Sequence, residues 1–396
     1  MRILFLDQFS ERGGAQIGLR EILDEAVRRG WQAMVMIPGS GPLHRDCADR
    51  GIPSCDLPLS RYGNGHKTAP DIVHYGRDSL RAATAVRAIV RQFAPHLIYV
   101  NGPRPLPAAL FGARGTPVIF HAHSYLDRRY TRAIARRCVD RARMRVIAIS
   151  EFVAQPFPGA TIVYNGVRDH GFLIRPLLPR LKTIGIIGRI SPEKGHLDFV
   201  DAARRLSCHY PGIRFAIFGA ALFADAAYER QVRAAAAGLP IDFHGWTNDV
   251  EAALHEIDLL AVPSGPAEGA TRVIMEAFSA GTPVVAYASG GIPELVRHGE
   301  TGLLTAARSA DALATGIEIL LRDAALMERF STQGRREWEQ RFQIERCQRR
   351  LCEVIAEVCS TTSECRFRSE AEVSSHGERL DTRGSGSVRN VSSSEE

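Results

Sequence analysis

The stretch EGATRVIMEAFSAGTPVVAYASGGIPELVRHGETGLL, residues 268–304, is the most informative segment of this 396-residue chain. Glu268 and Glu276 stand eight positions apart, and the residues between them have helical spacing. The pattern stops at Gly281-Thr282-Pro283, an apolar strand follows, and a Gly-Gly turn closes the segment. Carboxylates at the start of a core helix can hold hydroxyls, and a helix N-terminus can hold an anion. The stretch therefore predicts a ligand with many hydroxyls and a negative charge.

Outward from this stretch, short apolar runs alternate with longer amphipathic ones. In the first half we expect strands at 3–7, 33–37, 97–101, 118–121, 146–150 and 161–164. The helices expected between them are at 16–29, 79–93, 106–112 and 127–144. A linker is expected at 167–181, and after it we expect strands at 183–187, 214–218, 241–243, 259–262 and 284–288. The helices expected between these strands are at 196–207, 225–237, 250–255 and 271–280. This alternation predicts two doubly wound parallel sheets facing each other, with ligands outside the carboxyl ends of the strands.

The pattern also predicts the domain organisation. We expect an N-terminal Rossmann-like domain at 1–170 and a second Rossmann-like domain at 171–345. Helices are expected at 310–322, 324–340 and 344–358. The last of them, assigned to 346–359, either crosses back to the first domain or packs on its own. Residues 360–396 are rich in Ser, Arg, Glu and Gly, and we expect them to be disordered because they cannot bury enough apolar surface.

Composition narrows the class of protein. The net charge of +6 permits an anionic ligand or a membrane surface without demanding nucleic acid, and no nucleic-acid-binding motif is seen. The eight cysteines form no C-x-x-C pair, which argues against zinc and favours free thiols in a reducing cytoplasm. No apolar run reaches the roughly 18 residues of a membrane span, and MRILFLDQF is typical of a first strand rather than a signal peptide. We therefore expect a cytoplasmic protein.

Two places in the first half are candidate sites. Gly13-Gly14 precede a helix, where small residues let a ligand approach backbone amides, although a tight turn explains them equally well. His121 and His123 stand at the carboxyl end of a strand, within reach of a cleft, and the alternative is a histidine that closes a turn. A zinc site would need a third ligand nearby, and the sequence shows none.

In the second half, the segment GRISPEKG places Arg189 and Lys194 in one strand-to-helix loop. A guanidinium fork, an ammonium and free amides suit a diphosphate, whereas two solvated surface cations are the plainer interpretation. The order of residues is not that of a P-loop. His244-Gly245-Trp246 closes a further strand and is explained by a turn under an aromatic cover.

The segment 127–145 is rich in arginine. A solvated helix face explains such a run, and the alternative is a patch that faces anionic lipid. The arginines are at positions 128, 129, 132, 136, 137, 141, 143 and 145.

Together, GRISPEKG, VPSGPAEGATRVIMEAFSAGTPVVA and GGIPELVRHGETGLL resemble, in order and spacing, the retaining, nucleotide-sugar-dependent glycosyltransferases of family 4, which have the GT-B fold. The Glu268/Glu276 pair matches that family's E-x7-E motif. Gly13-Gly14, His123, Ser150 and the segment YNGV at 164–167 fall where the family places similar features. The resemblance covers about residues 1–345 and does not include the tail.

The resemblance implies a role for each residue. Arg189 and Lys194 would hold the donor diphosphate and stabilise the charge that develops on it. Glu276 would bind the ribose, Glu268 would lie at the sugar and the reacting face, and His123 would contact the sugar. The predicted catalytic residues are Glu268, His123, Arg189 and Lys194. The predicted donor-binding set adds Gly13, Gly14, Gly269, Ala270, Thr271, Arg272, Val273 and Glu276. Further candidates are His121, Ser150, Asn165, His244 and Glu294.

The implied function is transfer of a sugar from a nucleoside diphosphate-sugar to a hydroxyl acceptor in glycan or glycolipid assembly. No D-x-D occurs, so we expect no metal and no cofactor beyond the nucleotide-sugar co-substrate. The acceptor would include lipid-linked glycans, with a peripheral contact to the inner face of the membrane. The sequence departs from the family at Gly269-Ala270-Thr271-Arg272, where an aromatic is usual, so it predicts no particular sugar. The rivals are a nucleotide-sugar epimerase of the same fold and a non-catalytic nucleotide-sugar-binding subunit.

Overall fold

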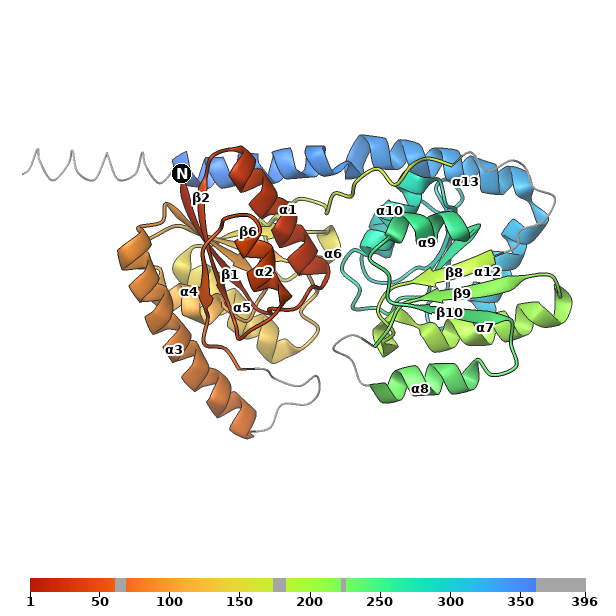
Figure 1. Ribbon diagram of the computed structural model, residues 1–396, viewed down its shortest axis with the longest axis horizontal. Helices are drawn as coiled ribbons and strands as arrows, with labels where there is room; N and C mark the ends of the chain where they lie inside the picture. Colours follow the sequence, from red (N-terminus) through yellow and green to blue (C-terminus); the bar gives the residue numbers. More distant parts are fainter. Residues whose placement is uncertain (61–68, 174–182, 222–225, 361–396) are drawn as a thin grey trace, which may run out of the picture.

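Strand β1 (Arg2–Asp7) shows why the first half of the chain forms a sheet covered on both faces. Ile3 and Phe5 belong to the apolar cluster on one face, and Leu4 and Leu6 belong to the cluster on the other. All four are fully buried, as expected for a central strand of a parallel sheet. The computed structural model describes residues 1–60, 69–173, 183–221 and 226–360, and it places two such α/β domains side by side (Figure 1).

The first sheet is parallel throughout, with strand order β3-β2-β1-β4-β5-β6-β7. Its remaining strands are β2 (Gln32–Ile37), β3 (Ser54–Asp56), β4 (Leu97–Asn101), β5 (Val118–Ala122), β6 (Arg145–Ala148) and β7 (Thr161–Ile162). Its helices are α1 (Gly14–Arg28), α2 (Pro42–Ala48), α3 (Ala69–Phe93), α4 (Leu106–Gly112), α5 (Arg129–Ala142) and α6 (Glu151–Ala154). Helix α1 covers one face of this sheet, and α3, α4 and α5 cover the other.

The second sheet is also parallel, with strand order β10-β9-β8-β11-β12-β13. Its strands are β8 (Thr183–Ile187), β9 (Arg214–Phe218), β10 (Ile241–Gly245), β11 (Leu259–Val262), β12 (Val284–Tyr287) and β13 (Leu303–Thr305). Its helices are α7 (His196–His209), α8 (Ala226–Ala235), α9 (Val250–Glu256), α10 (Arg272–Ala280), α11 (Ile292–Leu295), α12 (Ala310–Arg322) and α13 (Ala324–Glu337). The two sheets confirm the predicted pair of doubly wound domains.

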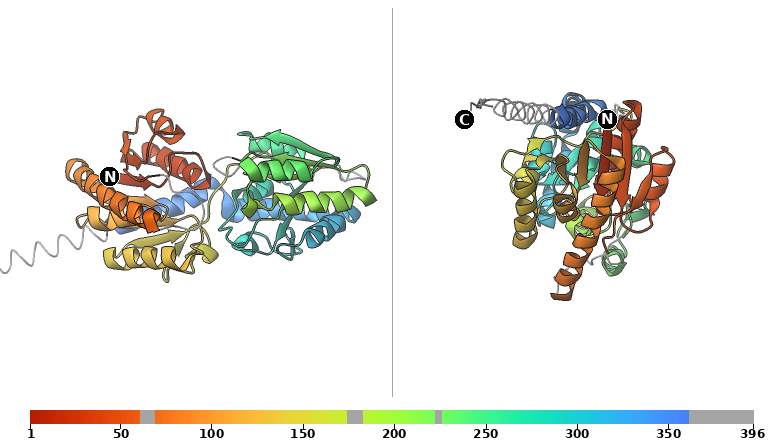
Figure 2. Two further views of the ribbon diagram at one scale, coloured as in Figure 1. Left: turned by 90° about the horizontal axis from the view of Figure 1, so that it is seen from below. Right: turned by 90° about the vertical axis from the view of Figure 1, so that its left-hand side faces the viewer.

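The chain end ties the domains together. Helix α13 runs into a π-helical turn at Trp338–Phe342, and a final helix at 344–360 returns along the first domain (Figures 1 and 2). Leu351 and Ile355 of that helix share an apolar cluster with Ile3 and Leu19. The helix therefore crosses back, which was one of the two arrangements considered. The predicted disordered tail lies outside the described residues except for residue 360, which ends this helix.

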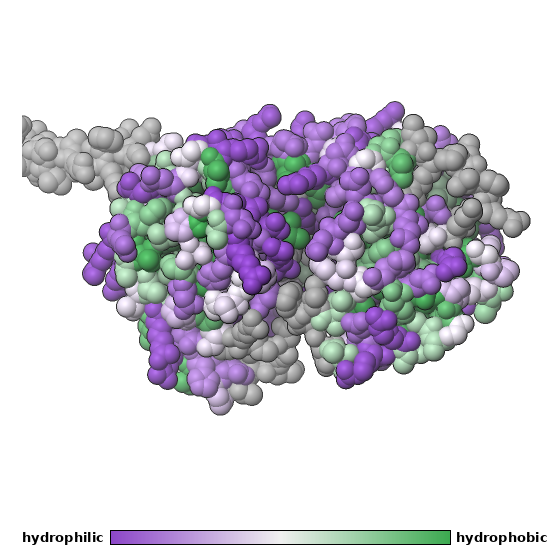
Figure 3. Space-filling model, viewed as in Figure 1, coloured by the Kyte–Doolittle hydropathy of each residue, from purple (hydrophilic) through white to green (hydrophobic). Residues whose placement is uncertain are grey.

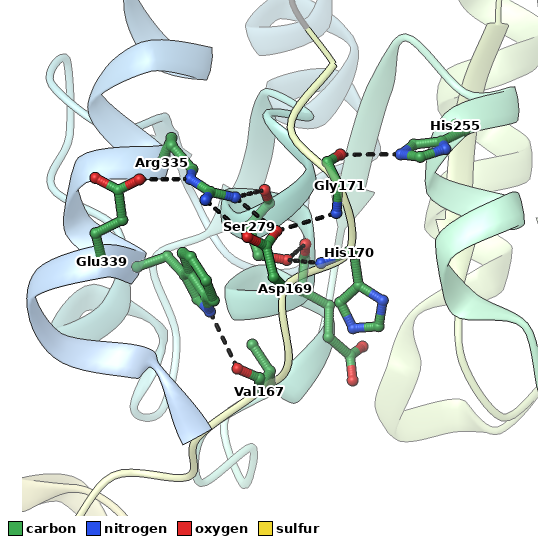
Figure 4. Close-up of polar contacts among 10 residues, drawn as sticks. Val167, Asp169, His170, Gly171, His255, Ser279, Arg335 and Glu339 are labelled. Carbon is green, nitrogen blue, oxygen red and sulfur yellow. Dashed lines mark hydrogen bonds and ion pairs between the residues drawn. The ribbon is translucent and has the colours of Figure 1, made fainter. Parts of the chain in front are cut away.

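The connection between the domains is anchored on the second one (Figure 4). Arg335 donates to both carboxylate oxygens of Asp169, at 2.7 and 2.8 Å, and to the Ser279 carbonyl at 2.7 Å. Trp338 Nε1 donates to the Val167 carbonyl at 3.2 Å. This segment is therefore held to α10 and α13 before the chain enters β8. Residues 174–181 of the predicted linker lie outside the described residues.

Helix α3 is longer than its sequence pattern predicts. It begins at Ala69, whereas the pattern predicts a start at residue 79. The added turns expose Ile72 and Val73, so they have no apolar face that points to the core, and they contain the poor helix former Gly76. Among the described helices, none has the length and hydropathy needed to cross a bilayer.

Candidate active site

The loop between β8 and α7 brings two cations to the carboxyl end of the second sheet. Lys194 ends a short 3-10 turn, and Gly195 follows with a φ of 73°, in the left-handed region that favours glycine. A Cβ at Gly195 would collide with the Pro263 carbonyl at the end of β11. The loop is thus pressed onto its neighbouring strand, and this contact fixes where Lys194 stands.

Lys194 is held by the first glutamate of the motif. Its Nζ lies 2.6 Å from Glu268 Oε2, and the two side chains are 24% and 15% exposed. Only three of the 50 basic residues are lysines, at positions 67, 182 and 194. The chain therefore uses a compact ammonium at this place although it uses guanidinium almost everywhere else. Arg189, from the same loop, pairs with Glu193 at 2.5 Å, and its buried Nε has no hydrogen-bond partner.

Helix α10 presents its N-terminus to the same region. It begins after Thr271, whose side chain makes no capping hydrogen bond. The amides of Arg272 and Val273 are therefore not capped by that side chain, and the helix dipole adds partial positive charge there. Glu276 stands one turn further along the helix, half-buried at 14% side-chain exposure. The Lys194 ammonium, these amides and two carboxylates thus lie at one end of the second sheet, and their roles toward a donor stay predictions.

The Gly290-Gly291 turn supports the loop that carries Glu268. The Gly291 amide donates to the Glu268 carbonyl at 2.9 Å. A Cβ on either glycine would collide with the backbone of residues 268–269. Both positions therefore need glycine because two backbones pack together here.

Arg272 connects the two domains through its side chain. It donates to both carboxylate oxygens of Glu21 on α1, at 2.8 and 3.2 Å, and its Nε is 3.7 Å from Glu276 Oε1. The Arg272 and Glu21 side chains are 14% and 15% exposed, and burial raises the pKa of Glu21. Sequence reasoning identified Arg272 but missed Glu21, which has the ordinary appearance of a helix-surface glutamate.

In the first domain, His123 follows β5 and faces the second domain. A Cβ on Gly269 would lie 3.3 Å from the His123 carbonyl oxygen. The ring is held from behind, with Nε2 2.6 Å from Asn101 Oδ1 at the end of β4. Burial, together with the positive charge of Arg272, lowers the pKa of His123 to about 3. The imidazole is therefore neutral at physiological pH.

Behind Asn101 lies Asp7, the last residue of β1. Asn101 Nδ2 donates to Asp7 Oδ2 at 2.6 Å, and Gln16 Nε2 and the Phe9 amide donate to Oδ1, both at 2.8 Å. Burial raises the pKa of Asp7 from 3.8 to about 6. Sequence reasoning placed Asp7 at a strand end but assigned it no role. A polar residue that ends an otherwise apolar strand was the available signal, and Asn101 carries the same signal.

His121 lies beside His123 rather than in its place. The two ring centroids are 3.9 Å apart, and His121 Nδ1 hydrogen bonds with the Tyr99 hydroxyl. His121 is 4% exposed, and burial holds its pKa well below the usual range. It thus packs under His123, which is the more exposed of the two.

Ser150 and Glu294 join the two domains. The Ser150 hydroxyl donates to the Gly269 carbonyl at 2.8 Å and accepts from the Val153 amide at 3.2 Å. Glu294 accepts from two backbone amides at the start of α6, both at 2.7 Å, and from the Tyr164 hydroxyl at 3.2 Å. These contacts position the domains, and a direct role of either residue toward a donor stays a prediction.

The side chain of His244 makes its contacts away from this network. The His244 ring stacks on Phe218 with centroids 4.2 Å apart, and its Nε2 is 3.4 Å from Glu256. Asn165 is half-buried beyond β7. Gly13 caps α1, and a Cβ on Gly14 would meet open space. Within residues 1–60, 69–173, 183–221 and 226–360, no group of three or more His, Cys, Asp or Glu could hold a metal ion.

Family models match both halves of the chain. The family described as "Glycosyltransferase Family 4" matches residues 12–169, and the family described as "Glycosyl transferases group 1" matches residues 176–337. A phosphatidyl-myo-inositol mannosyltransferase of Mycobacterium leprae is 27% identical over 351 residues, 82% of this chain and 88% of its own length. A D-inositol 3-phosphate glycosyltransferase of Mycobacterium marinum is 32% identical over 182 residues, 44% of this chain and 37% of its own.

Solved structures show the same architecture. HepE of Anabaena in complex with UDP superposes with a TM-score of 0.75 at 24% identity, over 90% of this chain and 100% of its own. HepE in complex with UDP and glucose gives a TM-score of 0.73 at 25% identity, over 90% and 99%. The two family matches cover both domains in order, and the structural matches extend over them together. The chain is therefore an enzyme that belongs to the family 4 glycosyltransferases and has their two-domain GT-B fold.

Proposed function

We propose that this glycosyltransferase takes its sugar from a nucleoside diphosphate-sugar and transfers it to a hydroxyl acceptor with retention of the anomeric configuration. The observation that carries the proposal is the convergence of Lys194, Glu268 and the N-terminus of α10 at one end of the second sheet. HepE, which shares the fold, binds UDP and glucose. The donor needs no cofactor because it is itself the activated substrate.

The cations account for departure of the leaving group. Breaking the bond between the sugar and the diphosphate places negative charge on phosphate oxygen. Lys194, Arg189 and the amides at the start of α10 are fixed in place before the reaction, so they stabilise that charge without reorganising. In this scheme they supply the charge that a metal ion supplies in other transferases.

The carboxylates account for the hydroxyls. Glu276 accepts from the ribose, and Glu268 accepts from the sugar while it also holds Lys194. His123 faces the same space from the first domain as a neutral ring that can hydrogen bond to a sugar hydroxyl. Gly13 and Gly14, at the N-terminus of α1, leave room for donor phosphate and acceptor to meet.

A donor panel tests the proposal. UDP-glucose and other UDP- and GDP-sugars are incubated with the protein, and sugar release or transfer is followed by NMR, which also reports the anomer formed. Lys194→Ala and Glu276→Gln should abolish most turnover, whereas the control Glu318→Gln, at an exposed ion pair on α12, should not. Full activity of both site variants would overturn their assignment. An epimerised sugar in the absence of acceptor identifies an epimerase instead, and binding without turnover identifies a non-catalytic subunit.

We further propose that the acceptor is presented at a membrane surface and that the enzyme works at the cytoplasmic face of that membrane. Helix α5 exposes Arg129, Arg136, Arg137 and Arg141, along with Tyr130 and Ile134. Basic residues beside an anionic leaflet contribute about 1 kcal/mol each, and apolar tips add to binding. On the face drawn in Figure 3, hydrophilic and hydrophobic residues also mix over α3.

Vesicle sedimentation tests the membrane contact. The protein should pellet with vesicles that contain phosphatidylglycerol and not with pure phosphatidylcholine, and salt should weaken the binding. Replacing Arg136, Arg137 and Arg141 by Gln should release it. The matched control replaces three exposed arginines of the second domain, Arg204, Arg205 and Arg233. Equal release by both triple variants would show that net charge alone is responsible.

A further inference from the structure

We propose that Asp7 and Asn101 form a relay that sets the tautomer of His123, which makes both of them positioning residues for the transfer reaction. The three residues stand at the ends of β1 and β4 and just after the end of β5, neighbouring strands in which Asp7 pairs with Asn101 and Asn101 with His121. Asp7 and Asn101 are fully buried. The inference rests on the proposed function, since it assumes that His123 meets the sugar.

Hydrogen-bond chemistry allows one arrangement of the relay. An ionised carboxylate only accepts, so the Asn101 atom 2.6 Å from Asp7 is the amide nitrogen. The amide oxygen then faces His123 Nε2, also at 2.6 Å. An amide oxygen only accepts, so Nε2 carries the ring proton. Nδ1 is left with a lone pair, and it has no hydrogen-bond partner among the described residues.

This tautomer decides what the ring can offer the substrate. Nδ1 accepts a hydrogen bond, so it can take the proton of a sugar hydroxyl and cannot donate to an oxygen. Because Nε2 is already bonded to Asn101, the ring also cannot rotate without breaking that bond. The orientation and the polarity of His123 are thus both determined from β1, two strands away.

Asp7 holds one further element in the same way. Gln16, in the first turn of α1, donates to Asp7, and Asn101 Nδ2 also lies 3.3 Å from the Ala15 carbonyl. The start of α1, where Gly13-Gly14 stand, is therefore tied to the same carboxylate as His123. A purely structural role for Asp7 in anchoring α1 is the competing explanation, so the experiment must report on the ring itself.

Burial makes the ionised Asp7 unfavourable to the fold, since its pKa is raised to about 6. At a pH above this value the group is a carboxylate despite its burial. An asparagine of the same shape would avoid this penalty. Groups that oppose stability in this way are expected at functional positions.

The variant Asp7→Asn inverts the relay without changing its shape. Phe9 and Gln16 both donate to Oδ1, so the oxygen of the new amide stays there and its nitrogen faces Asn101. Asn101 must then turn its oxygen toward residue 7 and its nitrogen toward His123. His123 Nε2 becomes the acceptor, and the ring proton moves to Nδ1.

Nitrogen NMR of protein labelled at histidine measures this directly, because protonated and unprotonated ring nitrogens resonate far apart, and His123→Gln assigns the signal. We expect wild type to carry the proton on Nε2 and Asp7→Asn to carry it on Nδ1. The kcat of Asp7→Asn should fall roughly 10- to 100-fold, as for other partners that orient a catalytic imidazole, with little change in donor KM.

The swap Asp7→Asn/Asn101→Asp provides the rescue. The new amide on β1 then donates to the new carboxylate on β4, and that carboxylate accepts from His123 Nε2, so the original tautomer and most of kcat should return. Asp198→Asn is the matched control, since Asp198 accepts from the Tyr287 hydroxyl in the second domain, and it should change neither quantity.

An Nδ1 proton in the wild type, or an unchanged tautomer in Asp7→Asn, would overturn the relay. Both readings use the free protein, so they stand even if no sugar is transferred. Melting curves identify a variant that fails to fold. If Asp7→Asn does not fold, the tautomer of His123 in the wild type alone decides whether the relay exists. A relay confirmed by NMR in a protein without transferase activity would instead count against the proposed function.

Discussion

The second-domain half of the site comes from two short segments, the loop at 188–195 and the loop with the first turn of α10 at 265–276, whereas the first-domain half takes Asp7, Asn101 and His123 from three strand ends. The first set is written as contiguous motifs because, in the proposed function, its amides and cations bind one diphosphate and its carboxylates bind the neighbouring hydroxyls. The second set is dispersed because a parallel sheet brings distant residues to one edge. We infer that the second domain supplies binding and charge stabilisation, and the first supplies the orientation of the sugar.

Removing Lys194 should break the second-domain half with the largest effect. Lys194→Ala deletes a fixed cation at the diphosphate, and losing one such preorganised group typically lowers kcat by about 100- to 1,000-fold. Steady-state kinetics with the preferred donor measure it. Arg205→Ala, at an exposed ion pair with Asp311, is the control and should behave as wild type. If the kcat of Lys194→Ala stays within roughly threefold of the wild-type value, Lys194 does not belong to the catalytic residues.

The Arg272–Glu21 pair is one of the contacts between the two domains, and breaking it should cost stability. Arg272→Met leaves a half-buried Glu21 unpaired, at about 3–5 kcal/mol. The double variant Arg272→Met/Glu21→Leu removes both charges and should recover most of the loss. Urea unfolding of wild type, the two single variants Arg272→Met and Glu21→Leu, and the double variant gives the coupling energy between the two side chains. Independent, additive effects would mean that the pair does not bridge the domains in solution.

The pH dependence of stability should report Asp7. Its pKa is 3.8 unfolded and about 6 folded, so the folded state binds the proton more tightly. Its contribution to the free energy of unfolding therefore falls as pH rises from about 4 to about 6, by roughly 3 kcal/mol in total, and is constant above. Comparing Asp7→Asn with wild type across this range isolates it. Parallel stability curves would show that burial does not raise this pKa.

Ser150→Ala should give the smallest effect. The hydroxyl caps α6 and donates to the Gly269 carbonyl, and each role is worth about 1 kcal/mol. We expect a slightly lower melting temperature and a modest rise in donor KM, because Gly269 belongs to the donor loop. Ser207, which bonds only within α7, is a suitable control. A collapse in kcat would instead give Ser150 a direct role.

The same contrast explains how much the sequence could predict. Short apolar runs and amphipathic helices with clear stops predicted both sheets, and the motifs around Lys194, Glu268 and Glu276 predicted residues that the fold brings together. Asp7, Asn101 and Glu21 were not predicted as site residues, because their partners are far away in sequence and only the packing of strands and domains joins them. The extra turns of α3 escaped prediction because they face solvent.

Nucleotide affinity separates the role of the second domain, which is binding, from that of the first, which is orientation of the sugar. Calorimetry with UDP or GDP, whichever the wild type binds, measures the diphosphate site without the sugar. We expect Lys194→Ala to weaken this binding severely, whereas Asp7→Asn should bind as wild type does and be slow only in transfer. Equal loss of nucleotide affinity in both variants, or full affinity in Lys194→Ala, would contradict this separation of roles.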